Sequence, residues 1–409
     1  MKDALKPSLK ELWEVSGVDY DDFKEVIGEL TSCTTLTQYS PFEVVLMSFC
    51  TEDKEAFFVD GHYYARDAKG EIKVLTRNQR LKKEKLAEKS VPADIIEEFR
   101  RNKLMLLLGR KDNKITAFTS PNLIGTLGQK LNLSGLELFE PNFERDAYFA
   151  KVLSKRKAPI NIVSRKIGDC TKVFAAFSDE YPYIPQTILL DIKDKISGRK
   201  DLGNAVCKGW RVNHSTSALY LEFPDFAADV SKMYNLPDVI TPGVILMTSD
   251  VGDCSVSCIG TWNVKGSRVV QSVYKRRHRG VVTSAGILSE IDKEVFQAYR
   301  KLPGRLADLL TIDISDPRDA IEYMIKKSDI ESVGKKVANA IQKGMIAELN
   351  PALKYTAYDL VCNLMSVPSR LSGVKEEALK KLEEKVMKAA FLKWETFNKS
   401  QKSVPVLSA

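Results

Sequence analysis

The 409-residue sequence has few residues suited to a transition-metal or disulfide site. Its three histidines are His62, His214 and His278, and none has a second histidine or cysteine at the short spacing that zinc sites use. The seven cysteines form no CxxC pair. We therefore expect no metal and no disulfide framework, and the dispersed, odd number of cysteines favours a reducing compartment.

Several catalytic motifs are also missing. The chain has no GxxxxGK[ST] loop, no GxGxxG after a strand-like run and no nucleophile elbow of a hydrolase. These absences argue against a nucleotide triphosphatase, a dinucleotide-dependent dehydrogenase and an α/β-hydrolase. We expect a non-enzymatic protein without a cofactor.

Long hydrophobic runs are absent as well. The N-terminus, MKDALKPSLKELWEV, has no apolar core of a signal peptide, and uncharged runs such as FEVVLMSFC are too short to span a bilayer. The sequence therefore predicts a cytoplasmic protein without a membrane partner.

The composition is that of a folded protein with a mild excess of positive charge. Hydrophobic residues make up 44% of the chain, and 62 Lys and Arg against 54 Asp and Glu give a net charge of +8. A chain of this length is expected to form roughly two or three compact units. The charge permits a polyanionic partner but is small beside that of dedicated DNA-binding domains.

Changes in hydrophobic period divide the chain into three parts. Residues 8–30 have helical spacing on both sides of Gly17 and predict a helical hairpin, and residues 42–76 predict a small antiparallel sheet. Strand-like runs dominate from Ile160 to Ser284, and helical patterns follow. We predict an α+β fold with a small N-terminal α/β unit (1–157), a central, mostly antiparallel strand-rich domain (158–288) and a helical C-terminal region (289–409).

The clearest strand pattern covers residues 254–264. Cys254, Cys258 and Trp262 fall on one face of this run, so both cysteines are expected to point inward. The turn KGS at 265–267 leads into a partner strand, RVVQSVY, which continues into the basic segment VYKRRHRGVV (273–282). This predicted hairpin places a cluster of cations at the edge or mouth of a sheet.

Basic residues are the strongest chemical feature, because cations on strands of one sheet can form a groove for backbone phosphate, and aromatic neighbours can stack on exposed bases. The alternative is that the charges mark an ordinary solvated surface. A further basic run contains Arg77, Arg80, Lys82, Lys83 and Lys85. The candidate nucleic-acid-binding residues are Lys265, Arg268, Lys275, Arg276, Arg277, Arg279, Lys208, Arg211, Arg165, Lys166, Trp210 and Tyr274.

The last long amphipathic segment is KEEALKKLEEKVMKAAFLKWETFNKS, from Lys375 to Ser400. Its apolar residues recur at steps of three and four, which predicts one helix with a single apolar face. This face either docks on its own domain or forms a homo-oligomer contact. The residues of the face are Leu379, Leu382, Val386, Ala390, Trp394 and Phe397.

Asp250 and Asp253, in TSDVGDCS, allow one enzymatic alternative. Two clustered carboxylates can bind a divalent cation, since hard cations prefer oxygen ligands. The competing interpretation is a glycine-containing bend with exposed acids. A metal-dependent enzyme therefore stays open as a minor hypothesis.

Two segments, KVFAAFSDEYPYIPQTILLDI (172–192) and ITPGVILMTSDVGDCSVSCIGTWNVKGSRVVQSVYKRRHRG (240–280), resemble the phage- and plasmid-associated family of uncharacterised proteins. In the first segment a strand ends at Ser178, Asp179 and Tyr181 before a helix. In the second, a proline-led strand enters a Ser249-Asp250-x-Gly252 bend and closes on His278-Arg279-Gly280.

The resemblance implies a mobile-element gene in a bacterial cell, a setting in which replication and recombination accessories are frequent. Together with the basic residues, it favours a protein that binds single-stranded nucleic acid, chiefly DNA, in phage or plasmid replication or recombination. The main alternative is a self-assembling structural or virion-associated protein.

Overall fold

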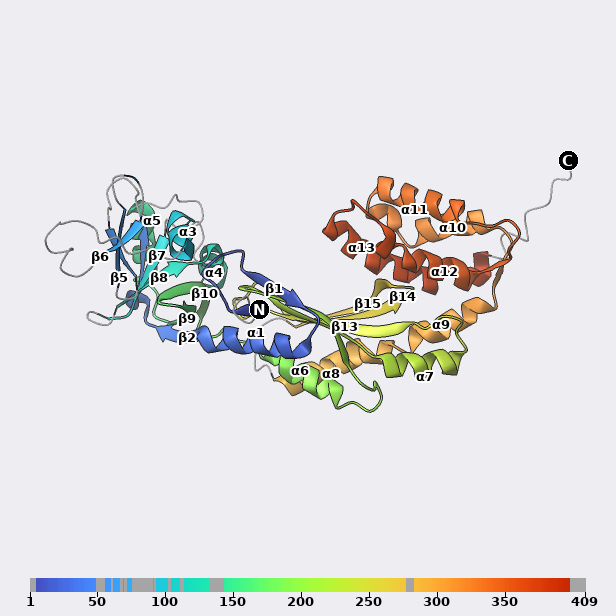
Figure 1. The fold of residues 1–409 in the computed structure, drawn as a ribbon, viewed down its shortest axis with the longest axis horizontal. Helices are drawn as coiled ribbons and strands as arrows, with labels where there is room; N and C mark the ends of the chain where they lie inside the picture. Colours follow the sequence, from blue (N-terminus) through green and yellow to red (C-terminus); the bar gives the residue numbers. More distant parts are fainter. Residues whose placement is uncertain are drawn as a thin grey trace.

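The computed structural model describes residues 5–48, 56–59, 62–66, 69, 72–75, 91, 93–101, 104–110, 114–131, 143–276 and 283–397. Two large, mostly antiparallel sheets precede a helical C-terminal part, which confirms the predicted α+β class. Figure 1 shows an elongated molecule with an N-terminal body at one end, a central sheet, and C-terminal helices above the far end of that sheet. No helix within the described ranges is long and apolar enough to cross a membrane.

The N-terminal body contains a six-stranded sheet in the order β2-β9-β10-β8-β7-β3, in which only the β10–β8 pair is parallel. A three-stranded sheet, β4-β5-β6, lies in the predicted segment 42–76. The strands are β2 (Thr34–Tyr39), β3 (Val44–Ser48), β4 (Ala56–Val59), β5 (His62–Arg66), β6 (Ile72–Leu75), β7 (Leu104–Leu108), β8 (Ile115–Thr119), β9 (Ile160–Ile167) and β10 (Cys170–Ser178). The helical elements are η2 (Pro41–Glu43), α3 (Ala93–Arg101), α4 (Pro121–Leu131) and α5 (Phe143–Leu153).

The boundary predicted near residue 158 does not coincide with the division between the sheets. β9 and β10 lie after it in sequence but form the middle of the N-terminal sheet, because β9 pairs with β2 along its length and β10 pairs with β8. Ile160 and Ile162 of β9 accordingly pack in the same apolar core as Leu106. The central sheet begins only after the helix that follows β10.

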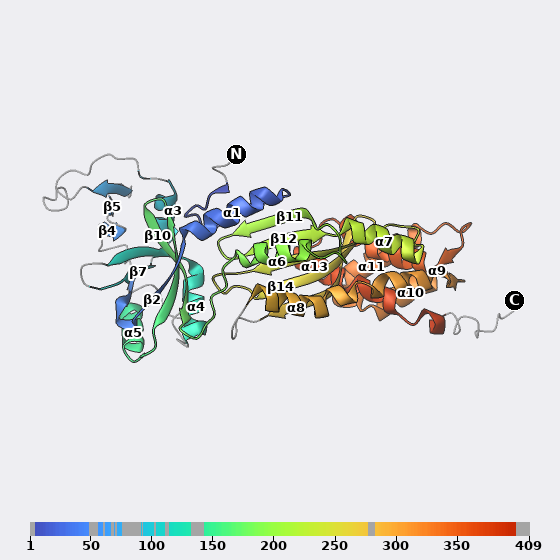
Figure 2. The ribbon, with the colours of Figure 1, turned by 90° about the horizontal axis from the view of Figure 1, so that it is seen from below.

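The central sheet is wholly antiparallel, in the order β1-β11-β12-β13-β14-β15. Helices cover one of its faces, as the views from the side and from below show (Figures 1 and 2). The strands are β1 (Glu14–Gly17), β11 (Val206–Asn213), β12 (Ser217–Glu222), β13 (Thr241–Thr248), β14 (Val256–Val264) and β15 (Ser267–Arg276). The covering helices are α1 (Tyr20–Cys33), α6 (Ile188–Ser197), α7 (Pro224–Tyr234), α8 (Ser284–Glu294), η4 (Phe296–Ala298) and α9 (Lys301–Leu310).

The helical hairpin predicted for residues 8–30 is wrong in its first half. Residues Glu14–Gly17 form β1, which pairs with β11, and only the second half is helical, as α1. Pairing with a long strand overrides the local helical pattern. Gly17 permits this contact, because a Cβ atom at this position would lie 2.6 Å from the indole ring of Trp210.

The C-terminal helices pack against the other face of the central sheet, over one end of β14 and β15 (Figure 1). Side-chain caps define several of their starts: Asp316 accepts from two backbone N–H groups of α10, and Thr356 and Asp359 form a capping box on α12. The elements are β16 (Asp313–Ile314), α10 (Pro317–Lys327), η5 (Ile330–Ser332), α11 (Lys335–Ala347), β17 (Tyr355–Thr356), α12 (Ala357–Ser366), η6 (Pro368–Arg370), α13 (Glu376–Val386) and η7 (Met387–Phe391).

The apolar face predicted near the C-terminus docks within the protein's own C-terminal helices. The segment is not one helix, because α13 ends at Val386 and a 3₁₀ turn follows. Leu382 and Trp394 are nevertheless fully buried, and the Trp394 ring meets Tyr323 of α10 edge-on at 5.7 Å. Of the predicted face, Leu379 alone is only partly buried. The prediction of docking on its own domain is confirmed.

The strand predicted from Cys254 begins two residues later, at Val256. Residues after β13 form a bend in which the Ser249 hydroxyl accepts from the backbone N–H groups of Val251 and Asp253. Cys254 therefore belongs to the bend and is partly exposed, whereas Cys258 is fully buried, which raises its thiol pKa. The predicted burial is confirmed for Cys258, whereas Cys254 is only partly buried and precedes the strand.

We expect Trp394→Ala to lower the free energy of unfolding by about 3 kcal/mol, because it empties a fully buried site. It also removes the hydrogen bond from the indole N–H to the Ala389 carbonyl at 3.0 Å. Urea unfolding followed by circular dichroism measures the loss. Phe391→Ala is the matched control: this ring is 48% exposed, so a loss below about 1 kcal/mol is expected. Equal losses for the two variants would contradict the packing described here.

Candidate nucleic-acid interface

Successive side chains of β15 point to opposite faces of the central sheet, so the predicted basic cluster is divided between the two faces. Lys275 lies opposite Ser257, and Arg276 lies opposite Val256. Arg276 points to the helix-covered face, where it forms an ion pair with Glu290 of α8. Lys275 is exposed on the other face. Arg277 and Arg279, and the separate run Arg77, Arg80, Lys82, Lys83 and Lys85, lie outside the described residues.

A continuous row of side chains connects Lys275 to Arg211 across the sheet. Directly paired residues of an antiparallel sheet project from the same face. Successive pairings therefore place five residues in one row from β11 to β15: Arg211, Ala218, Met247, Ser257 and Lys275. We call the face that carries this row the open face. At about 4.8 Å per strand, the two cations are separated by about 19 Å.

The neighbouring row of the open face is mostly apolar and partly exposed. It runs through Tyr220, Ile245, Ile259 and Val273, of which Val273 is 43% exposed. The Tyr220 hydroxyl donates to the carboxylate of Glu222 at 2.6 Å, and burial together with this contact raises the tyrosine pKa. The open face thus has an aromatic and aliphatic floor between cations at its two sides.

The two aromatic residues predicted to stack on bases lie on the opposite, helix-covered face. Trp210, Leu219, Leu246, Cys258 and Tyr274 form one buried row there. The Trp210 indole N–H donates to the carbonyl of Asp19 at 2.6 Å, and the Tyr274 hydroxyl donates to Glu290. Both rings belong to the core, so their predicted role is wrong. The tyrosine that does lie on the open face, Tyr220, was not predicted.

Besides Arg276 and the buried Arg165, four predicted cations form ion pairs with carboxylates. The pairs, with their N···O distances, are Arg211–Glu14 at 2.5 Å, Arg268–Glu383 at 3.1 Å, Lys265–Asp238 at 3.2 Å and Lys208–Glu222 at 3.6 Å. Arg211, Lys208 and Lys265 remain about half exposed. Among the described residues, Lys275 has no ionic partner.

Arg268 and Lys265 lie at the end of the open face that the C-terminal helices cover. Arg268 donates through Nε and a terminal nitrogen to the two oxygens of Glu383 on α13, and Ser267 accepts from the backbone N–H of Ser369 beside it. Lys265 occupies the left-handed position of the hairpin turn, with φ 51°. These two residues are therefore less suited to a long ligand than Arg211, Lys208 and Lys275.

Arg165 is fully buried and cannot contact a phosphate, which corrects its predicted role. It extends from β9, and one terminal nitrogen donates to both carboxylate oxygens of Asp250 at 2.8 and 2.9 Å. The other terminal nitrogen donates to the His214 carbonyl at 2.6 Å. Its neighbour Lys166 is exposed, but on β9 of the N-terminal sheet rather than on the open face.

The Asp250–Asp253 pair is engaged within the protein. Besides Arg165, the Asp250 carboxylate accepts from the Gln186 amide at 2.8 Å, and the Asp253 carboxylate accepts from Asn122. The described part of the chain contains no group of three or more His, Cys, Asp or Glu side chains that could hold a metal ion. The geometry therefore gives the metal-enzyme alternative no support.

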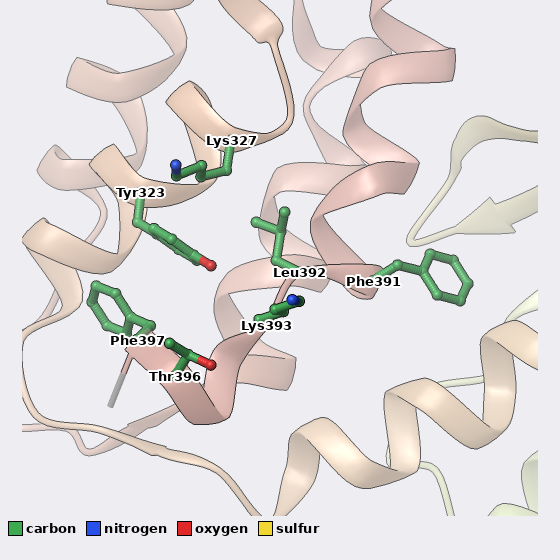
Figure 3. A pocket seen from close by; sticks show the side chains of 7 residues that line it. All are labelled: Tyr323, Lys327, Phe391, Leu392, Lys393, Thr396 and Phe397. Carbon is green, nitrogen blue, oxygen red and sulfur yellow. The ribbon is translucent and has the colours of Figure 1, made fainter. Parts of the chain in front are cut away.

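Two hollows lie in the C-terminal body, away from the open face. One, of about 460 Å³, is shown in Figure 3 between Tyr323, Phe397 and two lysines, Lys327 and Lys393. The other, of about 910 Å³, lies between residues 311–318 and 346–355. Neither hollow is lined by a residue of the open face.

Comparison with known proteins adds no further assignment. No family model matches the chain, and no curated protein or solved structure shows significant similarity to it. The open face is therefore interpreted from its own geometry.

The stability of the protein should fall in mild acid because of His214. This buried imidazole contacts the Ser8 carbonyl at 2.7 Å. Burial, with the charges of Arg165 and Lys172, lowers its pKa from 6.5 to about 3. Between these values the unfolded chain binds a proton that the native protein excludes, so native stability is lost as the pH falls below 6.5.

His214→Gln should remove this dependence while keeping a side-chain donor near Ser8. Between pH 7 and pH 5, the free energy of unfolding of the unmutated protein is expected to fall by on the order of 2 kcal/mol more than that of the variant. Urea unfolding at the two pH values measures the difference. Identical losses would show that His214 titrates normally in the native state.

Proposed function

We propose that the open face of the central sheet binds single-stranded nucleic acid, without catalysing a reaction on it. The observation that carries this proposal is the row from Arg211 to Lys275, which places two exposed cations on opposite sides of a partly apolar floor. A flexible polyanion crossing the strands can meet both cations. Its bases can then contact the floor between them.

The ion pairs on this face are compatible with phosphate binding. Arg211 and its partner Glu14 are 57% and 40% exposed, and exposed pairs of this kind contribute only about 0–1 kcal/mol. A phosphate can therefore replace the carboxylate at low cost, and Lys275 needs no such exchange. The binding energy would come largely from counterion release, so affinity should fall as salt rises.

The apolar floor of the open face favours binding of single strands over duplexes. A single strand exposes the faces of its bases, and stacking on an aromatic ring contributes about 1–3 kcal/mol per base with little sequence preference. Tyr220 is the aromatic residue of the open face, and Ile245 and Ile259 extend the apolar surface beside it. A stacked duplex offers no base faces to this surface except at its ends.

The proposed setting is a bacterial cell that carries a phage or plasmid, with the protein acting in replication or recombination. This part of the proposal rests on the resemblance of residues 172–192 and 240–280 described above. DNA is the proposed ligand and RNA is the alternative. Single-stranded oligonucleotides of both kinds, used in the binding measurements below, distinguish the two.

The double variant Arg211→Gln/Lys275→Gln tests the proposal. Removing two phosphate contacts should reduce the slope of log affinity against log salt by about 1.4, since each contact to a single strand contributes about 0.7. Fluorescence anisotropy with labelled single-stranded and duplex oligonucleotides, at several salt concentrations, measures the slope. Thermal unfolding should change little, because both side chains are exposed.

Lys232→Gln/Lys301→Gln is the matched control. It removes the same charge from exposed positions on α7 and α9, which lie across the sheet from the open face (Figure 1). In this control, the slope of log affinity against log salt should equal that of the unmutated protein. An equal reduction in both double variants would indicate diffuse attraction, and no binding by the native protein would refute the proposal.

A second test concerns Tyr220. Tyr220→Ala removes the ring and should weaken binding of single strands by about 1–3 kcal/mol, whereas Tyr220→Phe keeps the ring and loses only the bond to Glu222. The phenylalanine variant should therefore bind nearly as the native protein does. Equal weakening in both variants would point to the hydroxyl group and away from stacking.

A further inference from the structure

Within the described part of the chain, the outer edge of β2 has no strand beside it. β2 is the terminal strand of the N-terminal sheet and pairs with β9 on one side only, over six consecutive residues. In such a strand every second residue directs its backbone N–H and C=O away from the sheet. Exposed edge groups of this kind are a template for pairing with another strand.

β2 lacks the features that proteins use to block edge pairing. Its sequence, TTLTQY, has no charge and no proline, and its pairing with β9 has no bulge. The nearest charged residues along the chain are Glu29 and Glu43. At its centre Leu36 is 43% exposed. The edge is thus six residues long, uncharged and without a bulge, and it has an exposed leucine at its centre, so it can accept a further strand.

Two other edge strands among the described residues, β1 and β15, are better protected. β1 has only four residues, and one of them, Glu14, carries a charge. β15 contains a bulge and three cations, Arg268, Lys275 and Arg276. β3, at the far side of the N-terminal sheet, continues into residues outside the described part of the chain. The lack of protection at β2 therefore calls for an explanation of its own.

We propose that β2 is a dimerisation edge that pairs antiparallel with β2 of a second copy of this chain. The argument for a second copy is self-complementarity: a strand without charges meets no like charge when it faces itself, whereas a charged edge would repel its own copy. One such edge per chain joined by a twofold axis closes the assembly at two copies. The two N-terminal sheets would then form one continuous sheet.

The twofold axis also restricts the register. An axis perpendicular to the sheet keeps every residue on its own face, so directly paired residues must be an even number of positions apart or identical. Every register centred on one residue satisfies this condition, and we choose the one centred on Leu36 because that side chain is exposed. It places Leu36 against Leu36 of the second copy, which covers the exposed side chain, and pairs Thr35 with Thr37 of the second copy.

Analytical ultracentrifugation of nuclease-treated protein over about 1–200 µM tests the dimer, because a contact this small should make dimer formation depend on concentration. Leu36→Lys should keep the protein monomeric by placing two like charges opposite each other. Ile115→Lys is the matched control, since Ile115 is equally exposed at 43% but belongs to β8, which has a strand on each side. It should dimerise like the native protein.

A mixture of Leu36→Lys and Leu36→Glu chains tests directly whether Leu36 of one copy faces Leu36 of the other. Each variant alone should be monomeric, and the mixture should recover the dimer because opposite charges now face each other in the Leu36-centred register. Hydrogen exchange of the β2 amides should slow as the native protein concentration rises. A native protein that stays monomeric, a series of species larger than dimers, or a dimer that Leu36→Lys leaves intact would overturn the proposal.

Discussion

The relation between the two large sheets depends on the buried ion pair of Arg165 and Asp250. Arg165 extends from the N-terminal sheet, and Asp250 lies in the bend after β13 of the central sheet. A buried pair compensates for its desolvation only when all remaining polar groups are bonded. Here the guanidinium also bonds the His214 carbonyl and the Thr34 hydroxyl and lies 4.4 Å from the centre of the Phe174 ring, while Gln186 bonds the carboxylate. A second buried cation of the same body, Lys172, is bonded to the Leu9 carbonyl, Glu11 and Glu98.

These networks explain which parts of the fold could be predicted from the sequence. The hairpin of β14 and β15 and the apolar face near the C-terminus are local patterns, and both were predicted, apart from the first residues of the strand and the break after Val386. The role of Arg165 was not predictable, because its partner is 85 positions away along the chain. A strand cation has the same local pattern whether it faces solvent or a buried carboxylate. The division between the two sheets differs from the predicted boundary near residue 158 for a related reason, since β9 pairs with β2, which lies far earlier in the chain.

The candidate site, too, could be predicted only in part from local sequence patterns. Alternation alone separates Lys275 from Tyr274 and Arg276, so the division of the basic cluster between two faces was contained in the sequence. Which face is covered was not, because that depends on α8, which supplies Glu290 to both Tyr274 and Arg276. Tyr220 could have been found from SALYLEF, in which Leu219 and Leu221 alternate with it and mark the opposite face as the core side.

The open face and the proposed dimer edge are connected through Arg165. Its guanidinium bonds Thr34, the first residue of β2, and also Asp250, in the bend between β13 and β14 of the central sheet. The edge strand and the open face therefore belong to one bonded frame, in which neither moves without disturbing a buried charge. In the proposed dimer, this frame would hold two open faces at a constant separation. A nucleic acid strand long enough to reach both would then bind the second face intramolecularly, at the effective concentration set by the connecting nucleotides, so that its affinity for the dimer would exceed that for one face without any new contact.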